Sequence, residues 1–326
     1  MECIGNSNTH RIHIIFPDDS KEFKCPYILA IPHEYKEGDS IILESNNQES
    51  SPKIVTSAVE STIDSLFSIL YHSQNKNPIL VPLLPSNPNG IPYYQQLSIE
   101  CFDETLARQF YRIDNQVVSM IEDAKKIISG LKGKKVGEQV ILNGYSSSGV
   151  FAQRFALLHP ELVKEACIGG AIGSMPLPIT EYQGKEIGYP LGIADYETLT
   201  GKPFDIESYK KIKFHYYVTE GENERKSETR FTEDNKPAPM CDMSYMERSV
   251  PQHVGQTIRD CFGRDSFERF NAQLVVAEDM GLSIDYHQPY PGLNHHNING
   301  AAHSFIASCI TESNNLSQNN NEKTNK

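Results

Sequence analysis

Short hydrophobic runs alternate along the chain with longer stretches in which hydrophobic residues recur every three or four positions. A short run bounded by turn residues is typical of a buried strand, and the longer spacing is typical of a helix that packs by one face. The short runs lie at 11–16, 27–32, 40–44, 78–84, 139–144, 163–170, 212–218 and 282–286. The helical stretches lie at 56–71, 103–130 and 147–159, and from about 253 to 281. Strands separated by helices of this length predict an α/β fold, a mostly parallel sheet with helices on both faces.

Capping signals predict where two of the helices begin and end. Asp103 can cap the helical stretch that follows it, and Gly130 is a suitable residue to end that stretch. Further along the chain, Asp265 and Glu268 have the spacing of a capping box. We therefore expect one helix to begin at Asp103 and another to begin at Asp265.

Three segments do not follow the alternation of strands and helices. Residues 171–211 are rich in glycine, proline and tyrosine, and their place between two sheet strands predicts a small cap insertion. Residues 225–250 are polar, and we expect only an irregular loop there. Residues 313–326 contain many asparagines and serines without an apolar anchor, so we expect a disordered tail behind a single domain at 1–312.

One stretch near the middle of the chain combines a buried strand, a sharp turn and a helix, the arrangement of a nucleophile elbow. A serine in such a turn adopts a strained backbone, and only small residues fit two positions to either side. Of three consecutive serines, only Ser146 has small residues at both positions, Gly144 and Ser148. The other two would place Tyr145 or Val150 there. Ser146 is thus the candidate nucleophile, although Ser148 replaces the last glycine of the G-x-S-x-G pattern, and a plain serine-rich turn is the simpler alternative.

Composition narrows the classes of function. The 326 residues carry a net charge of −12 without a basic cluster, which argues against binding to nucleic acid or to anionic lipid. The chain contains no apolar run of the ~18 residues that a membrane span needs, and residues 1–10 lack an apolar export signal. The seven cysteines are dispersed and form no C-x-x-C pair, which favours a reducing, cytoplasmic compartment. Cys167 and Cys261 lie in apolar stretches and are predicted core residues.

An elbow serine needs a base to remove its proton and an acid to orient that base. In the elbow-containing hydrolases the chain order is serine, acid, histidine, each in a loop behind a strand of one sheet. Behind the strand at 212–218 comes an acidic turn with Glu220, Glu222 and Glu224. Behind the last predicted strand comes a loop with His295. The sequence therefore offers both partners in the required order, although the acidic turn is equally typical of a solvated surface.

The same residues resemble the α/β-hydrolase superfamily over roughly 26–310. Residues 143–146, followed by a helix that ends at His159 and Pro160, look like the nucleophile segment of that family. The resemblance implies the α/β-hydrolase fold with a mostly parallel central sheet and a small cap insertion.

The acid and the base follow from two further parts of the resemblance. Segments 200–205 and 211–212, with the turn at 220–222, are similar to bacterial hydrolases that carry the acid in a G-E-x-D turn. That similarity implies Glu222 as the acid, with Glu220 next, where the group usually has aspartate. In the same way, 290–295 looks like the G-x-G-H turn of the family and implies His295 as the base.

Other histidines compete with His295. His296 is its neighbour, and His303 lies in a predicted final helix that suits a packing role. The three could also form a metal site, but no carboxylate at ligand spacing accompanies them on the segment, so we expect no metal and no cofactor.

The implied reaction is acyl transfer in two stages. His295 takes the proton of Ser146, the serine attacks an ester carbonyl, and water later releases the acyl group. The expected oxyanion donors are the backbone N–H groups of Ser147 and, from the loop after the third strand, Asn46. The expected partner is a small-molecule ester, and the oligomeric state is not predicted. An acyltransferase with the same acyl-enzyme, or a non-catalytic binding protein with this fold, are the alternatives.

Overall fold

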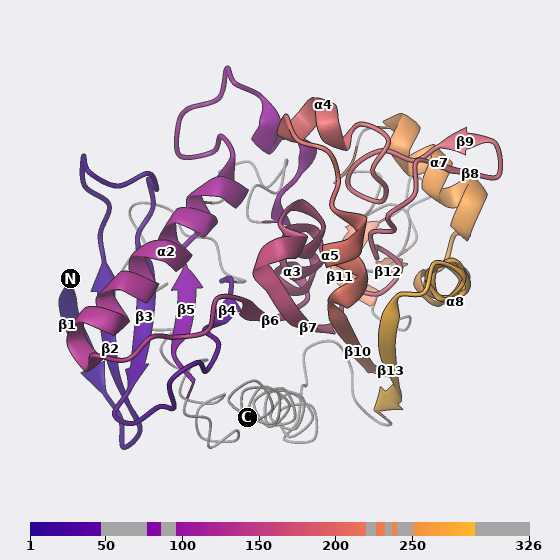
Figure 1. Ribbon diagram of the computed structural model, residues 1–326. Coiled ribbons are helices and arrows are strands. Elements are labelled where there is room, and N and C mark those ends of the chain that lie inside the picture. The colour runs from indigo at the N-terminus through magenta and orange to yellow at the C-terminus, as the bar shows by residue number, and fades with distance from the viewer. Residues whose placement is uncertain are drawn as a thin grey trace.

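The computed structural model describes residues 1–46, 77–85, 96–219, 226–231, 237–239, 250 and 252–290. In this part of the chain, a nine-stranded sheet has the order β1-β2-β3-β5-β4-β6-β7-β10-β13 (Figure 1). Its strands are β1 (Glu2–Asn6), β2 (His10–Ile15), β3 (Tyr27–Pro32), β4 (Ile42–Glu44), β5 (Ile79–Pro82), β6 (Val140–Tyr145), β7 (Val163–Gly169), β10 (Lys213–Thr219) and β13 (Ser283–Tyr290). Pairing is parallel from β5 to β13 and antiparallel from β1 to β5. The predicted mostly parallel sheet is confirmed.

Strand β1 and the strands within 225–250 were not predicted from the sequence. Strand β1 is mostly exposed and pairs with one neighbour at the edge of the sheet, so its sequence carries no run of buried residues. Strands β11 (Lys226–Phe231) and β12 (Pro237–Pro239) form a separate two-stranded sheet. The prediction of irregular loop for 225–250 is wrong for these two segments.

The helices of the described residues flank this sheet. They are η2 (Ile99–Phe102), α2 (Ile113–Lys132), α3 (Ser147–Leu158), η3 (Pro160–Leu162), α4 (Tyr196–Thr200), α5 (Ile206–Lys211), α7 (Gln252–Phe262) and α8 (Ser266–Asp279). The predicted start of α8 is confirmed, because the Asp265 carboxylate accepts hydrogen bonds from the backbone N–H groups of Phe267 and Glu268, completing the capping box. The predicted helix at 56–71 and the tail at 313–326 lie outside the described residues.

Helix α2 begins ten residues after the predicted start. The Asp103 carboxylate accepts its hydrogen bonds from the backbone and hydroxyl of Thr105, which forms a local turn and caps no long helix. Arg112 has a left-handed backbone with φ 45°, which breaks helical geometry just before Ile113. At the other end Gly133, with φ 66°, caps the helix three residues beyond Gly130. The prediction of a helix at 103–130 is therefore wrong at both ends.

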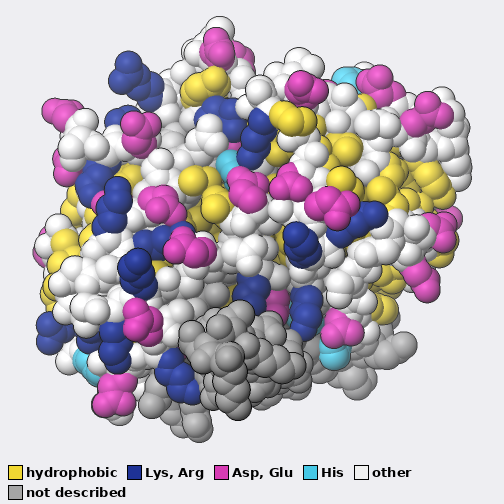
Figure 2. Space-filling view, viewed as in Figure 1, with side chains coloured by type: hydrophobic (Ala, Val, Ile, Leu, Met, Phe, Trp, Pro, Cys, Tyr) yellow, Lys and Arg dark blue, Asp and Glu magenta, His cyan; other side chains and the backbone are white. Residues whose placement is uncertain are grey.

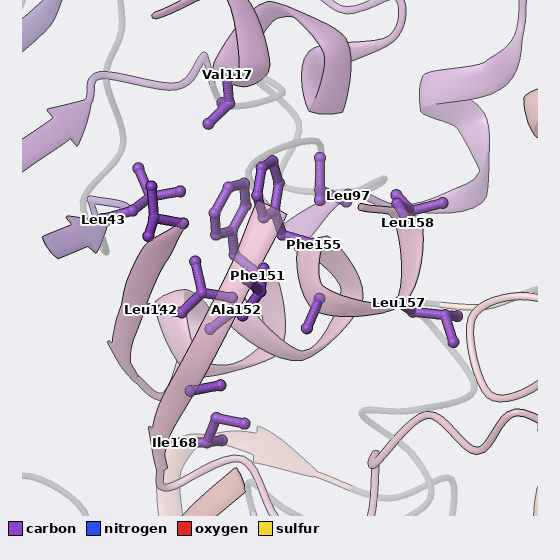
Figure 3. Close-up of a cluster of buried hydrophobic side chains, with 14 of the residues drawn as sticks. Leu43, Leu97, Val117, Leu142, Phe151, Ala152, Phe155, Leu157, Leu158 and Ile168 are labelled. Atoms are coloured by element: carbon purple, nitrogen blue, oxygen red, sulfur yellow. The ribbon is translucent and has the colours of Figure 1, made fainter. Parts of the chain in front are cut away.

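The main hydrophobic core lies between the sheet and helices α2 and α3. Figure 3 shows Phe151 and Phe155 of α3 facing Leu142 of β6, and the two phenylalanine rings stack with centroids 5.6 Å apart. The neighbouring Ile141 belongs to a second, smaller core on the opposite face of the sheet. Cys167 is fully buried in this second core, as its apolar surroundings in the sequence predicted. The side chains of the strand before Ser146 are therefore fixed from both faces.

Residues 171–211 lie between β7 and β10 and contain β8 (Glu181–Tyr182), β9 (Lys185–Glu186), α4 and α5. The β8–β9 hairpin lies beside α7 (Figure 1), where the Tyr182 ring stacks on Phe262 with centroids 5.1 Å apart.

Figure 2 shows acidic and basic side chains mixed over the face in view. Among the helices that the structure describes, none is long and apolar enough to cross a bilayer.

Candidate active site

Ser146 lies at the carboxyl end of β6, directly before α3. Its backbone has φ 59° and ψ −117°, a region that residues with a side chain rarely adopt and that costs about 1–3 kcal/mol. Its N–H donates a hydrogen bond of 2.9 Å to the carbonyl of Gly169, at the end of the adjacent parallel strand β7. The residue is partly exposed. The turn therefore holds this serine in a strained conformation at the carboxyl edge of the sheet, where solvent reaches it.

Gly144 leaves no room for a side chain. A β-carbon at this position would lie 2.2 Å from the carbonyl oxygen of Ser148 and 2.7 Å from the nitrogen of Gly149. Such distances are far inside van der Waals contact, so the strand and the helix can approach this closely only with glycine here. The small-neighbour rule that selects Ser146 from the sequence has this close approach as its physical basis.

Ser148 occupies the place of the last glycine in the G-x-S-x-G pattern and is 1% exposed. Its hydroxyl accepts a hydrogen bond of 2.8 Å from the Tyr145 N–H and donates one of 3.0 Å to the Tyr145 carbonyl. Both bonds close the turn around Ser146. Gly149 then allows α3 to approach β7, because a β-carbon there would lie 2.8 Å from the Gly169 oxygen. The serine that replaces the glycine of the motif thus stabilises the same turn through its hydroxyl.

Helix α3 begins at Ser147, immediately behind the candidate nucleophile. The side chain of Ser146, its N-cap residue, makes no capping hydrogen bond to the first turn. The N-terminus of a helix concentrates unpaired N–H groups and a partial positive charge, which attracts a developing oxyanion. The Ser147 N–H belongs to this first turn, and its role as an oxyanion donor stays a prediction.

Asn46, the second expected donor, follows β4. The register pairs Glu44 with Asn143, so two more residues bring Asn46 beside the end of β6. Asn46 is 5% exposed, and its side-chain oxygen accepts a hydrogen bond of 2.9 Å from the Leu84 N–H. This bond ties the segments after β4 and β5 together near the elbow.

Glu44 and Asn143 form a polar pair between β4 and β6. The Asn143 amide nitrogen donates a hydrogen bond of 2.9 Å to the Glu44 carboxyl, and Asn143 is 4% exposed. Burial raises the pKa of Glu44 to about 7, although the bond from Asn143 acts in the opposite direction. The sequence analysis missed this pair, because Glu44 closes a short apolar run without any motif around it.

The predicted acid and base, Glu222 and His295, lie outside the described residues, as do Glu220, Glu224, His296 and His303. The strands that precede the two loops are described. Strands β7, β10 and β13 are parallel neighbours beyond β6, and Thr219 at the end of β10 pairs with Tyr290 at the end of β13. Strands β10 and β13 therefore end at the same edge of the sheet as β6, which ends at Tyr145.

Gln96 is a polar residue that the sequence analysis did not single out. It is 2% exposed, and its amide nitrogen lies 3.0 Å from the Ser147 hydroxyl. No local signal marks it, because its segment is polar and the contact spans 51 residues.

No group of three or more His, Cys, Asp or Glu residues within the described ranges could hold a metal ion.

A parallel sheet with a strained serine turn at its carboxyl edge, flanked by helices, is the α/β-hydrolase fold. Among solved structures, the chain is similar to poly(aspartic acid) hydrolase-1 from Sphingomonas sp. KT-1, with a TM-score of 0.54 and 15% identity over 93% of this chain and 98% of that one. It also matches carboxyl esterase 2 from Tuber melanosporum, with a TM-score of 0.48 and 11% identity over 94% of this chain and 87% of that one. An S-formylglutathione hydrolase from Agrobacterium tumefaciens matches with a TM-score of 0.44 and 10% identity over 98% of each chain. No family model and no curated protein sequence matches the chain.

Proposed function

We propose that the protein is a serine hydrolase that cleaves a small carboxylic ester through an acyl-enzyme on Ser146. The observation that carries the proposal is the backbone of Ser146, with φ 59° at the carboxyl edge of the sheet and a Gly144 that admits no side chain. A surface turn has no need of such strain, whereas a nucleophile that must be exposed and fixed does. The first of the structural relatives is named a hydrolase, which agrees with this class of reaction.

The proposed reaction has two stages. His295, oriented by Glu222, removes the proton from the Ser146 hydroxyl as its oxygen attacks the ester carbonyl. The carbonyl oxygen becomes negative and is stabilised by the N–H groups of Ser147 and Asn46. The bond to the alcohol then breaks and His295 returns the proton to the leaving oxygen. In the second stage His295 takes a proton from water, and the water oxygen attacks the acyl carbonyl. The bond to the Ser146 oxygen then breaks, the carboxylic acid leaves, and His295 returns the proton to Ser146.

We also infer that residues 171–211 cap this site. The segment begins just after Gly169, whose carbonyl accepts from the Ser146 N–H. Farther along it, the hydroxyl of Tyr189 donates to the carbonyl of Leu97, the residue next to Gln96. The segment is thus joined to the end of β7 and to the residue next to Gln96. A segment placed in this way contributes to the selection of the ester.

The decisive test is covalent labelling with a fluorophosphonate probe, followed by identification of the labelled peptide. Wild type should be labelled on Ser146 and should hydrolyse a short-chain p-nitrophenyl ester, whereas Ser146→Ala should do neither. Ser148→Ala is the matched control within the serine run, because the Ser148 hydroxyl is buried and bonds to both backbone groups of Tyr145 in the turn. Labelling that persists in Ser146→Ala would show that another residue is the nucleophile, and an unlabelled wild type would favour a binding protein.

A further inference from the structure

Gln96 and Arg154 form a buried polar link to the first turn of α3. The side-chain nitrogen of Gln96 donates a hydrogen bond of 3.0 Å to the Ser147 hydroxyl oxygen. The backbone carbonyl of Gln96 accepts one of 3.0 Å from the Arg154 guanidinium, two turns along the same helix. Both residues are 2% exposed. The glutamine is therefore held against α3 at two points, by its side chain and by its backbone.

The neighbouring residue restrains this segment as well. Leu97 is 1% exposed and has a left-handed backbone with φ 54°, and its carbonyl accepts a hydrogen bond from the Tyr189 hydroxyl. A non-glycine residue keeps such a backbone only where the surroundings fix it. Arg154 of α3 binds the Gln96 carbonyl, and Tyr189 of the 171–211 segment binds the Leu97 carbonyl. Because the backbone at residues 96 and 97 is held by both bonds, the Gln96 amide has a fixed direction relative to Ser147.

The direction of the hydrogen bond determines what the Ser147 hydroxyl can do. An amide nitrogen only donates, so the Ser147 oxygen is the acceptor in this contact. The hydroxyl proton must then point away from Gln96. Ser147 is partly exposed, and in the described part of the chain none of its contacts provides an acceptor for that proton. The proton is available to a molecule bound beside Ser146.

We propose that the Ser147 hydroxyl is an additional hydrogen-bond donor to the substrate, and that Gln96 is the positioning residue that directs it. The inference rests on the proposed ester hydrolysis at Ser146. The acceptor is the ester carbonyl oxygen, which becomes negative as the serine attacks. A donor that accepts a hydrogen bond itself is polarised and binds an anionic oxygen more strongly than a neutral one. The hydroxyl therefore acts mainly in the transition state, which affects kcat more than KM.

Four variants test this assignment by steady-state kinetics on a p-nitrophenyl ester. Ser147→Ala removes the hydroxyl but keeps the backbone N–H, and kcat should fall roughly 10²-fold with a small change in KM, as for the loss of an oxyanion donor. Ser147→Thr keeps a hydroxyl and should retain most of kcat. Gln96→Glu replaces the donor with an acceptor that captures the hydroxyl proton, so its kcat should fall as in Ser147→Ala. Gln96→Met removes the donor without a charge and should give a smaller loss.

A double variant shows whether Gln96 directs the Ser147 hydroxyl or only supports the fold. In a Ser147→Ala background, Gln96→Glu should cause little further loss, because its effect acts through the missing hydroxyl. Losses that multiply would mean that Gln96 only supports the fold, and an unchanged kcat in Ser147→Ala would overturn the inference outright. Gln139→Glu is the matched control, since Gln139 is exposed at the opposite end of β6 and should leave kcat unchanged.

Failure of the proposed function has a different signature. Wild type would then show neither ester turnover nor fluorophosphonate labelling of Ser146. Wild type that reacts in both assays, combined with unaffected Ser147→Ala and Gln96→Met variants, would reject only the role of the hydroxyl. Thermal unfolding of each variant, followed by circular dichroism, identifies any loss of activity that results from misfolding.

Discussion

Replacing Glu44 with glutamine should stabilise the protein at neutral and alkaline pH and should change little in acid. Glu44 lies on β4, and its carboxyl accepts the hydrogen bond from Asn143 on β6. Some of the residue is accessible to solvent, but its carboxyl group is surrounded by protein atoms. Burial therefore raises the pKa of Glu44 from 4.5 to about 7, against the smaller opposite effect of Asn143.

Asn143 supplies an independent reason to expect a protonated carboxyl. Its side-chain oxygen is buried and has no hydrogen-bond donor among the described residues. A protonated Glu44 carries an O–H group that can donate to this oxygen while its other oxygen accepts from the Asn143 nitrogen. The two side chains would then be joined by two complementary bonds. An ionised carboxylate leaves the Asn143 oxygen without a donor.

The sign and size of the effect follow from proton linkage. The folded protein binds the Glu44 proton more tightly than the unfolded chain, so the stability from this group is complete below pH 4.5 and is lost as the pH rises to about 7. One pKa unit corresponds to about 1.4 kcal/mol, so the total loss is about 3 kcal/mol. Glutamine stays neutral and offers Asn143 both a donor and an acceptor. Glu44→Gln should therefore avoid that loss.

Urea unfolding of wild type and Glu44→Gln at about pH 5 and about pH 8 measures this effect. The two proteins should have similar midpoints at the lower pH, and the variant should unfold at a higher urea concentration at the upper pH. Glu138→Gln is the control, because its side chain is 92% exposed and should show no such difference. A Glu44→Gln variant that gains nothing at the upper pH, or that is destabilised there, would contradict a raised pKa of Glu44 in the folded protein.

Three further substitutions address the elbow and the packing behind it. Gly144→Ala should abolish fluorophosphonate labelling, because the added carbon would lie 2.2 Å from the Ser148 oxygen. Ser148→Ala should lower the free energy of unfolding by about 1–3 kcal/mol while leaving labelling detectable, because the Tyr145 N–H loses its partner; urea unfolding measures this. Asp114→Asn should cost about 3–5 kcal/mol in the same assay, because Asp114 is 1% exposed and accepts from His159. Burial lowers the pKa of His159, but the Asp114 carboxylate raises it above 6.5 overall, so NMR titration should show a lower pKa for His159 in this variant.

Sequence patterns correctly predicted the end of a helix where that end depends on hydrogen bonds between residues close in the chain. The capping box at Asp265 is confirmed because both of its partners lie within three residues. The start of α2 was predicted at Asp103 and is wrong, because the left-handed Arg112 and the bonds from the Gln116 side chain to the Arg108 and Tyr111 carbonyls fix a turn there. Hydrophobic spacing continues through this turn, so periodicity alone does not reveal it.

In the candidate site too, features set by residues close in sequence could be predicted, and contacts between distant segments could not. The strained turn at Ser146 could be predicted from sequence, because the requirement for small neighbours acts over two residues. The contacts of Gln96 with Ser147 and Arg154 join segments 51 and 58 residues apart. No pattern in a single sequence encodes such a pair, because a buried glutamine and a loop glutamine look the same until the fold brings them to their partners.

Strain at Ser146 explains why so many of these contacts are concentrated at one turn. A backbone at φ 59° returns to a relaxed conformation unless several independent bonds oppose the change. Here the Gly169 carbonyl holds the Ser146 N–H, and the Ser148 hydroxyl holds both backbone groups of Tyr145. Gly144 removes the steric obstacle to the close approach of strand and helix. The hydrogen bonds act on different atoms, so the loss of one bond should weaken the turn without releasing it. Reactivity at Ser146 should accordingly fall in steps as the contacts are removed singly and then together.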